Sequence, residues 1–112
     1  MRAVVVKINA GEITDWKSFH AVFERDLGFP HFYGKNMNAW IDCMTSIDDP
    51  DSGMTSVTVG DDELAVLEIS GARLFRERCR EEYDALIECA AFVNYRRVEV
   101  GERVILALTL ID

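Results

Sequence analysis

The sequence predicts an α/β fold in which a small three-stranded parallel sheet is covered by helices. Three apolar runs have the composition of buried strands, at residues 3–8, 64–70 and 103–111. Two helical patterns follow the first run and two follow the second. Because helical crossovers between successive strands favour a parallel sheet, this order of elements leads to the predicted class. The 112 residues, 49% of them hydrophobic, are expected to form a single domain over 1–112.

The first strand, AVVVKI, ends at an Asn-Ala-Gly turn. A helix follows from Thr14 or Asp15, either of which can cap it, to about Leu27. Its apolar face consists of Trp16, Phe19, Val22, Phe23 and Leu27. Gly28 is placed to end the helix. His20 has no neighbours with metal-ligand spacing, so we expect it at the surface or at the boundary of the core.

The first helix is followed by the stretch FPHFYGKNMNAWIDCMTSI. Pro30 cannot continue a helix, so the chain must break before it. An aromatic pair, Phe32 and Tyr33, then leads to Gly34, which is expected to use backbone angles closed to other residues. Asn36 is a natural N-cap, and a second helix is predicted to begin there.

Residues three and four apart share a face of this second helix, which gives it two sides. The side expected in the core holds Trp40, Cys43, Met44 and Ile47. The other side holds Met37, Asn38, Ile41, Asp42 and Thr45. This second side combines apolar surface with one acid beside the loop aromatics, a mixture typical of a protein-docking surface. The pattern alone also fits a partly buried amphipathic helix whose polar residues merely face water.

An acidic segment, residues 48–63, connects the second helix to the next strand. It contains six acids and no base, and Pro50 and Gly53 mark a turn in it. Its acids do not meet the ligand spacing of an EF-hand calcium loop. We therefore expect a solvated acidic loop and no metal site.

Two helical patterns lie between the second and third strands. The first, at residues 72–79, carries arginines within reach of Glu77, Glu81 and Glu82, which favours a salt-bridged solvated face over a phosphate-binding patch. The second runs from about residue 82 to residue 95. Its expected core stripe is Tyr83, Leu86, Ile87, Ala90, Ala91 and Val93. The charged residues that follow are expected to turn the chain into the last strand, which is apolar enough to be buried on both faces.

Composition excludes several classes of function. Twelve basic residues against twenty acidic ones give a net charge of −8, which argues against direct nucleic-acid binding and favours a basic partner. No apolar run has the length of a membrane span and the N-terminus has no signal-peptide pattern, so a cytoplasmic location is expected. Cys43, Cys79 and Cys89 form no CxxC pair, which argues against a disulfide framework or a zinc ribbon. No catalytic motif is present, so neither an enzyme nor a cofactor is predicted.

Two sets of residues form a recognisable pattern. The first is Pro30, Phe32, Tyr33, Gly34, Asn36, Ala39, Asp42, Cys43, Met44 and Thr45. The second is Ile8, Asn9, Gly11, Glu12 and Ile13. The first set resembles the inhibitory segment of the barstar family, the bacterial intracellular inhibitors of barnase-type ribonucleases, and the second resembles that family's first strand and turn. The resemblance covers residues 1–47 well and is loose beyond them. It implies a barstar-like fold, with helices packed around a three-stranded parallel sheet.

The resemblance implies a ribonuclease inhibitor, of the immunity or antitoxin type, that occludes the active site of a basic extracellular-type ribonuclease or related toxin. Asp42 matches the family's key acid, and its carboxylate would take the place of an RNA phosphate. Phe32 matches an aromatic that stacks on the nuclease's catalytic site, although it lacks the hydroxyl of the more usual Tyr. The remaining predicted partner-binding residues are Tyr33, Gly34, Asn36, Met37, Asn38, Ile41, Thr45 and Glu88.

Several residues depart from the family pattern. Asn38 stands where the family's best-known member has an acid, and His31 and Lys35 add positive charge. The family's further interface acid, on a later helix, aligns with either Glu88 or Asn94. These departures imply a different cognate partner, an altered affinity or lost inhibition. The charge reversals at His31 and Lys35 favour an alternative, a barstar-like binding module whose partner is not a ribonuclease. A third possibility, a small enzyme or ligand-binding domain, would require a defined pocket with convergent polar groups.

Overall fold

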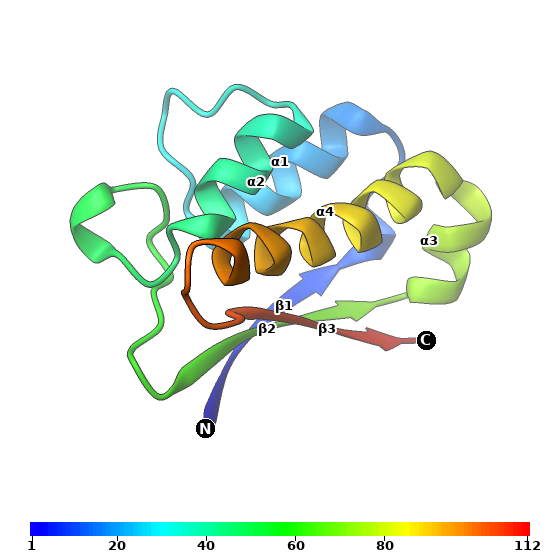
Figure 1. Cartoon of the computed structure of the whole chain (residues 1–112). Helices are drawn as coiled ribbons and strands as arrows, with labels where there is room; N and C mark the ends of the chain where they lie inside the picture. Colours follow the sequence, from blue (N-terminus) through cyan, green and yellow to red (C-terminus); the bar gives the residue numbers. More distant parts are fainter.

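Three strands and four helices form two layers in the computed structural model, which describes all of residues 1–112 (Figure 1). The strands are β1 (Arg2–Asn9), β2 (Glu63–Ser70) and β3 (Leu106–Ile111). They pair in parallel in the order β1-β2-β3, with Val5 beside Val66 and Val66 beside Ala107. The predicted α/β class with a three-stranded parallel sheet is therefore confirmed.

The helices also follow the predicted order. They are α1 (Trp16–Leu27), α2 (Met37–Thr45), α3 (Ala72–Arg78) and α4 (Arg80–Glu99), with single 3-10 turns η1 (Ala10–Glu12) and η2 (Pro50–Ser52). The α4 helix is longer than predicted at both ends. Its charged last turn stays helical because Arg97 is buried there and its guanidinium is bonded to three neighbouring segments.

Local signals set the ends of α1 as the sequence predicts. Asp15 is the N-cap, and its carboxylate accepts a hydrogen bond from the backbone N–H of Ser18 at 2.8 Å. Ser18 completes a capping box by accepting from the backbone N–H of Asp15. At the other end Gly28 has φ of 68°, a left-handed conformation that favours a residue without Cβ.

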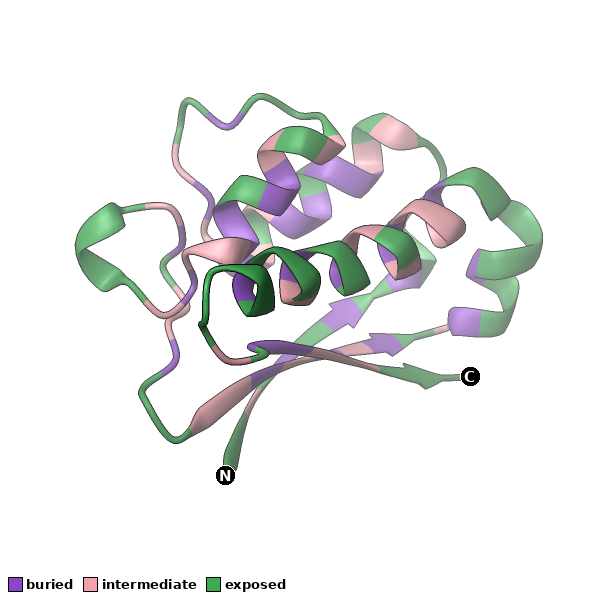
Figure 2. Cartoon of the chain, viewed as in Figure 1, coloured by how far each residue is buried: buried purple, intermediate pink, exposed green.

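The sheet carries helices on only one face, because α1, α2 and α4 all lie on the same side of it (Figure 1). Side chains alternate accordingly in β1, where Val6 and Ile8 are buried and Val5 and Lys7 are exposed (Figure 2). The prediction that the last strand is buried on both faces is therefore wrong. β3 is an edge strand with no helix on its outer face, and its last residues, including Leu110, are exposed.

The arginines of α3 and of the start of α4 do not pair with the predicted glutamates. Arg80 pairs with Asp84 one turn further on, at 3.0 Å, and Arg78 donates to backbone carbonyls after β1. Glu81 instead accepts a hydrogen bond from Nε1 of Trp16 at 2.7 Å. The contacts of Arg78 and Glu81 join α3 and α4 to the first helix and to the turn before it, so they position elements of the fold.

Candidate protein-docking site

The aromatic loop, defined here as residues 29–36, is anchored from beneath and presents one ring to solvent. Phe29 and Tyr33 are buried and their ring centroids lie 4.7 Å apart. Phe32, between them in the chain, is 65% exposed. Of the two aromatics predicted to meet a partner, Phe32 is thus available for contact, whereas Tyr33, only 5% exposed, supports the loop.

His20 is part of that support, and the prediction that it lies at the surface or at the boundary of the core is wrong, because it is buried. Nδ1 of His20 lies 2.5 Å from the hydroxyl of Tyr33, and the imidazole stacks on Trp16 with ring centroids 5.7 Å apart. Burial lowers the pKa of His20 and raises the pKa of Tyr33, so the pair is neutral near pH 7. A neutral imidazole can meet a phenol hydroxyl without leaving a buried charge.

The turn into α2 differs in one detail from its prediction. Gly34 does not take a left-handed conformation, which falls instead on Lys35, with φ of 54°. The next residue, Asn36, has extended backbone angles and caps the helix by accepting from the backbone N–H of Ala39 at 2.8 Å. The predicted N-cap is therefore confirmed, and the left-handed residue that precedes it is a lysine.

The α2 helix buries one of its two predicted sides and part of the other. Trp40, Cys43, Met44 and Ile47 are buried, as predicted. Asn38 and Asp42 are exposed, and Met37 and Thr45 are half-buried. The predicted exposure of Ile41 is wrong, since this side chain is only 8% exposed. The helix packs against α4 as well as against the core, so it buries more than one stripe.

A hollow of about 190 Å³ lies between the aromatic loop and α2. It is lined by Pro30, Phe32, Tyr33, Gly34, Ala39, Asp42, Cys43 and Met54. The apolar ring of Phe32 and the carboxylate of Asp42 thus border the same small depression. The hollow is mainly apolar, and burial raises the pKa of the Cys43 thiol to about 11, so Asp42 is the one charged group that lines it. Such a depression can receive a cationic side chain whose stem is apolar.

Arg96, on α4, reaches this site across the surface. Its Nη1 lies 3.0 Å from Oδ1 of Asp42. Both side chains remain accessible, at 43% exposed for Arg96 and 58% for Asp42. The candidate docking carboxylate is therefore paired with a cation from the same chain.

A scan against protein-family models matches residues 3–107 to a family described as Barstar (barnase inhibitor). The match spans nearly the whole chain. This chain belongs to the barstar family. The match confirms the family resemblance seen in the first part of the chain and extends it through β2, α3 and α4 to residue 107, at the start of β3. Barstar proteins are inhibitors and bind barnase-type ribonucleases, so membership supports a barnase-inhibitor-like role in general. A search of curated proteins finds no match.

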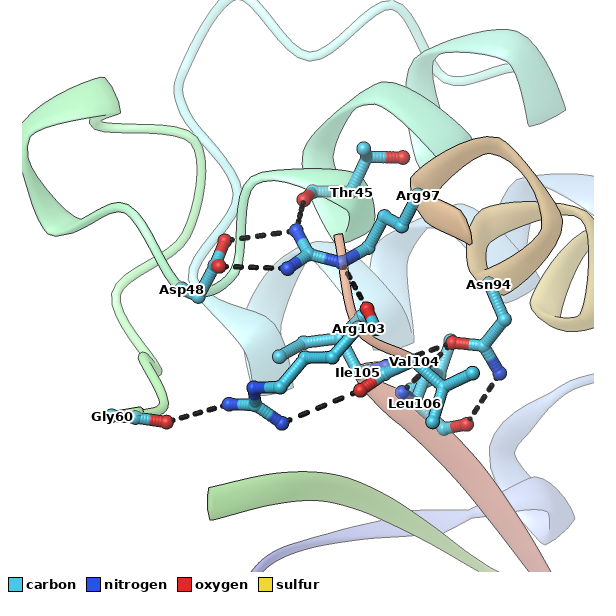
Figure 3. A network of polar contacts seen from close by, with 9 residues as sticks. All are labelled: Thr45, Asp48, Gly60, Asn94, Arg97, Arg103, Val104, Ile105 and Leu106. Carbon is cyan, nitrogen blue, oxygen red and sulfur yellow. Dashed lines mark hydrogen bonds and ion pairs between the residues drawn. The ribbon is translucent and has the colours of Figure 1, made fainter. Parts of the chain in front are cut away.

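Within this barstar-family fold, Arg97 fixes the C-terminal end of α2 (Figure 3). Its guanidinium is 3% exposed and lies 2.8 Å from Oδ2 of Asp48. It also donates to the backbone carbonyls of Thr45 and Arg103, each at 2.9 Å. Nearby, the side chain of Asn94 bonds the backbone at the start of β3. The buried cation of Arg97 therefore ties α2, the acidic segment and the segment before β3 to α4.

The later-helix acid of the barstar family has no clear counterpart at this site. Glu88 is exposed, but it lines a different hollow, of about 430 Å³, together with Arg76 and Arg80. It precedes Arg96 by eight residues, which is about 12 Å along a helix. The alternative, Asn94, uses its amide to bond β3. The α4 residue that the structure brings to Asp42 is Arg96.

No group of three or more His, Cys, Asp and Glu side chains is arranged to hold a metal ion. None of the helices combines the length and the apolar character needed to cross a membrane.

Proposed function

We propose that this chain is a bacterial cytoplasmic ribonuclease inhibitor, of the immunity or antitoxin type, that docks its aromatic loop and α2 into the active site of a basic ribonuclease. The observation that carries the proposal is the common hollow bordered by Phe32 and Asp42. Both side chains are exposed, and both are held by elements anchored in the core. Family membership supports the class of partner.

The chemistry of RNA cleavage explains why a carboxylate suits this position. A ribonuclease must hold a phosphate with Arg, Lys or His, and charge-assisted bonds from these groups to a carboxylate are strong. Asp42 offers such a carboxylate on a short, capped helix. Phe32 would contact the partner next to Asp42, while the buried side chains of Tyr33 and Ile41 would support this surface from the core. The net charge of −8 would speed encounter with a basic partner at low salt.

The test is calorimetric titration into barnase, with RNA cleavage measured in parallel, for the wild type and for Asp42→Ala. We expect one-to-one binding with loss of cleavage, weakened in the variant by about 2–5 kcal/mol because the partner's cations lose their counter-charge. That range comes from interfaces that include the barstar–barnase complex itself. The matched control is Asp84→Ala, which removes another acid that is paired with an arginine at 3.0 Å. Equal binding by Asp42→Ala and the wild type would contradict the role of Asp42.

A second candidate, a barstar-like binding module with a partner other than a ribonuclease, is favoured by the basic side chains near the docking surface. His31 and Lys35 are exposed in the aromatic loop, and Arg96 contacts Asp42. Absence of binding and of inhibition across barnase-type ribonucleases, by a protein shown to be folded, would favour this candidate.

A further inference from the structure

Only one of the two carboxylate oxygens of Asp42 accepts a hydrogen bond in the free chain. Arg96 donates to Oδ1 at 3.0 Å, and Oδ2 accepts no hydrogen bond within the chain. A partner cation can therefore approach Oδ2 while Arg96 still holds Oδ1. It would then meet a second positive charge on the same carboxylate.

Asp42 is also the only acid with which Arg96 forms an ion pair. The neighbouring Arg97 is committed to Asp48, and Glu99, which is exposed three residues after Arg96 on α4, forms no ion pair with Arg96. If a partner drew Asp42 away, the guanidinium of Arg96 would lose its one ion pair while it lay beside the incoming cation, and the nearest acid along α4 would be Glu99.

We propose that Arg96 is a specificity-determining residue of the docking surface. It competes with the partner's cation for Asp42, so it disfavours a site that offers cations alone. It favours a site that places an acid beside its cation, because that acid would receive Arg96. The partner class in this inference rests on the proposed function, whereas the competition at Asp42 rests on the ion pair alone.

The size of the effect follows from the exposure of the pair. Exposed ion pairs contribute little free energy, and removing the competitor is expected to tighten binding of a cation at Asp42 by about two- to fivefold. A gain of this size is measurable when each variant is compared with a control of the same net charge.

The test uses a tetra-arginine amide as the probe and follows the titration by NMR at the Asp42 carboxyl and at the α2 amides. The variants are Arg96→Gln, the double variant Arg96→Gln with Asp42→Asn, and the control Arg80→Gln. The control removes the same charge from another exposed arginine that pairs with an acid at 3.0 Å. We expect Arg96→Gln to bind the peptide at Asp42 about two- to fivefold more tightly than Arg80→Gln, and the gain to vanish in the double variant. Equal affinities for Arg96→Gln and Arg80→Gln at this site, or a gain that persists in the double variant, would overturn the proposal.

Inhibition of barnase by the same variants separates this inference from the proposed function. A gain in the peptide titration without inhibition by any variant would support the competition and reject ribonuclease inhibition of this type. Inhibition by the wild type without a gain in the peptide titration would reject the competition and leave the proposed function in place.

Discussion

The imidazole of His20 and the hydroxyl of Tyr33 meet at 2.5 Å beneath the aromatic loop, so a buried titratable group supports the candidate docking surface. Burial is the main cause that lowers the pKa of His20, and Lys35 lowers it further, while Glu24 opposes the shift. The folded chain therefore binds a proton at this site less readily than the unfolded chain does.

This relationship predicts a pH dependence of stability. A histidine with a lowered folded pKa stabilises the fold fully above its unfolded pKa, near 6.5, and that stability is lost as the pH falls through and below this value. We expect the free energy of unfolding in urea to decrease between pH 7.5 and pH 5, and to decrease less in His20→Gln. The control is His31→Gln, at an exposed position. An identical pH slope in His20→Gln and the wild type would contradict this origin.

Removal of the buried Arg97 is predicted to be costly. The change Arg97→Ala would leave Asp48 and two backbone carbonyls without their shared donor, and we expect the free energy of unfolding to fall by about 3 kcal/mol. The control is Arg73→Ala, which breaks an exposed pair with Asp112 and should change stability by no more than about 1 kcal/mol. Urea denaturation measures both, and similar losses in the two variants would argue against a special role for Arg97.

Removal of the N-cap of α2 is predicted to lower stability less than removal of Arg97, and to act mainly on the first turn of this helix. Asn36→Ala removes the bond to the backbone N–H of Ala39 and should destabilise the chain by about 1 kcal/mol. Asn38→Ala, at an exposed position two residues further on, should stay within about 0.5 kcal/mol of the wild type. Amide hydrogen exchange in the first turn of α2 would locate the loss. Unchanged exchange there in Asn36→Ala would contradict the capping role.

Two phenylalanines of the aromatic loop are predicted to separate binding from folding. The exposed ring of Phe32 makes little contact with the core, so Phe32→Ala should leave stability within about 0.5 kcal/mol. Under the proposed function the same change should weaken ribonuclease binding by about 2 kcal/mol or more. Phe29→Ala deletes a buried ring and should cost about 3–5 kcal/mol of stability. A large stability loss in Phe32→Ala, or full affinity for the ribonuclease, would count against this division.

The features that the sequence predicts best are those set by neighbouring residues. Asp15 and Asn36 cap helices, and Gly28 ends one, because each acts on backbone groups within a few positions of itself. The sheet could be predicted in the same way, since apolar runs and the helices between them determine a parallel order. Neighbouring residues do not determine every detail of a turn, since the left-handed conformation expected at Gly34 is found at Lys35.

The features that the sequence does not predict depend on tertiary packing. The Asp42–Arg96 pair joins residues 54 positions apart, and nothing near either residue indicates the other. His20 is buried because the aromatic loop folds over α1 and supplies Tyr33 as its partner. Ile41 is buried in a helix that packs against both the core and α4, and helical periodicity alone does not predict this second packing contact.

Arg97 has a consequence for how this surface would associate with a partner. Because its buried guanidinium joins the end of α2 to α4 and to the segment before β3, α2 is already ordered in the free chain. An ordered surface has little conformational entropy left to lose when a complex forms. The chain is therefore expected to bind its partner with little change in its backbone. Diffusional encounter would then set the association rate, and the contacts in the complex would set its lifetime.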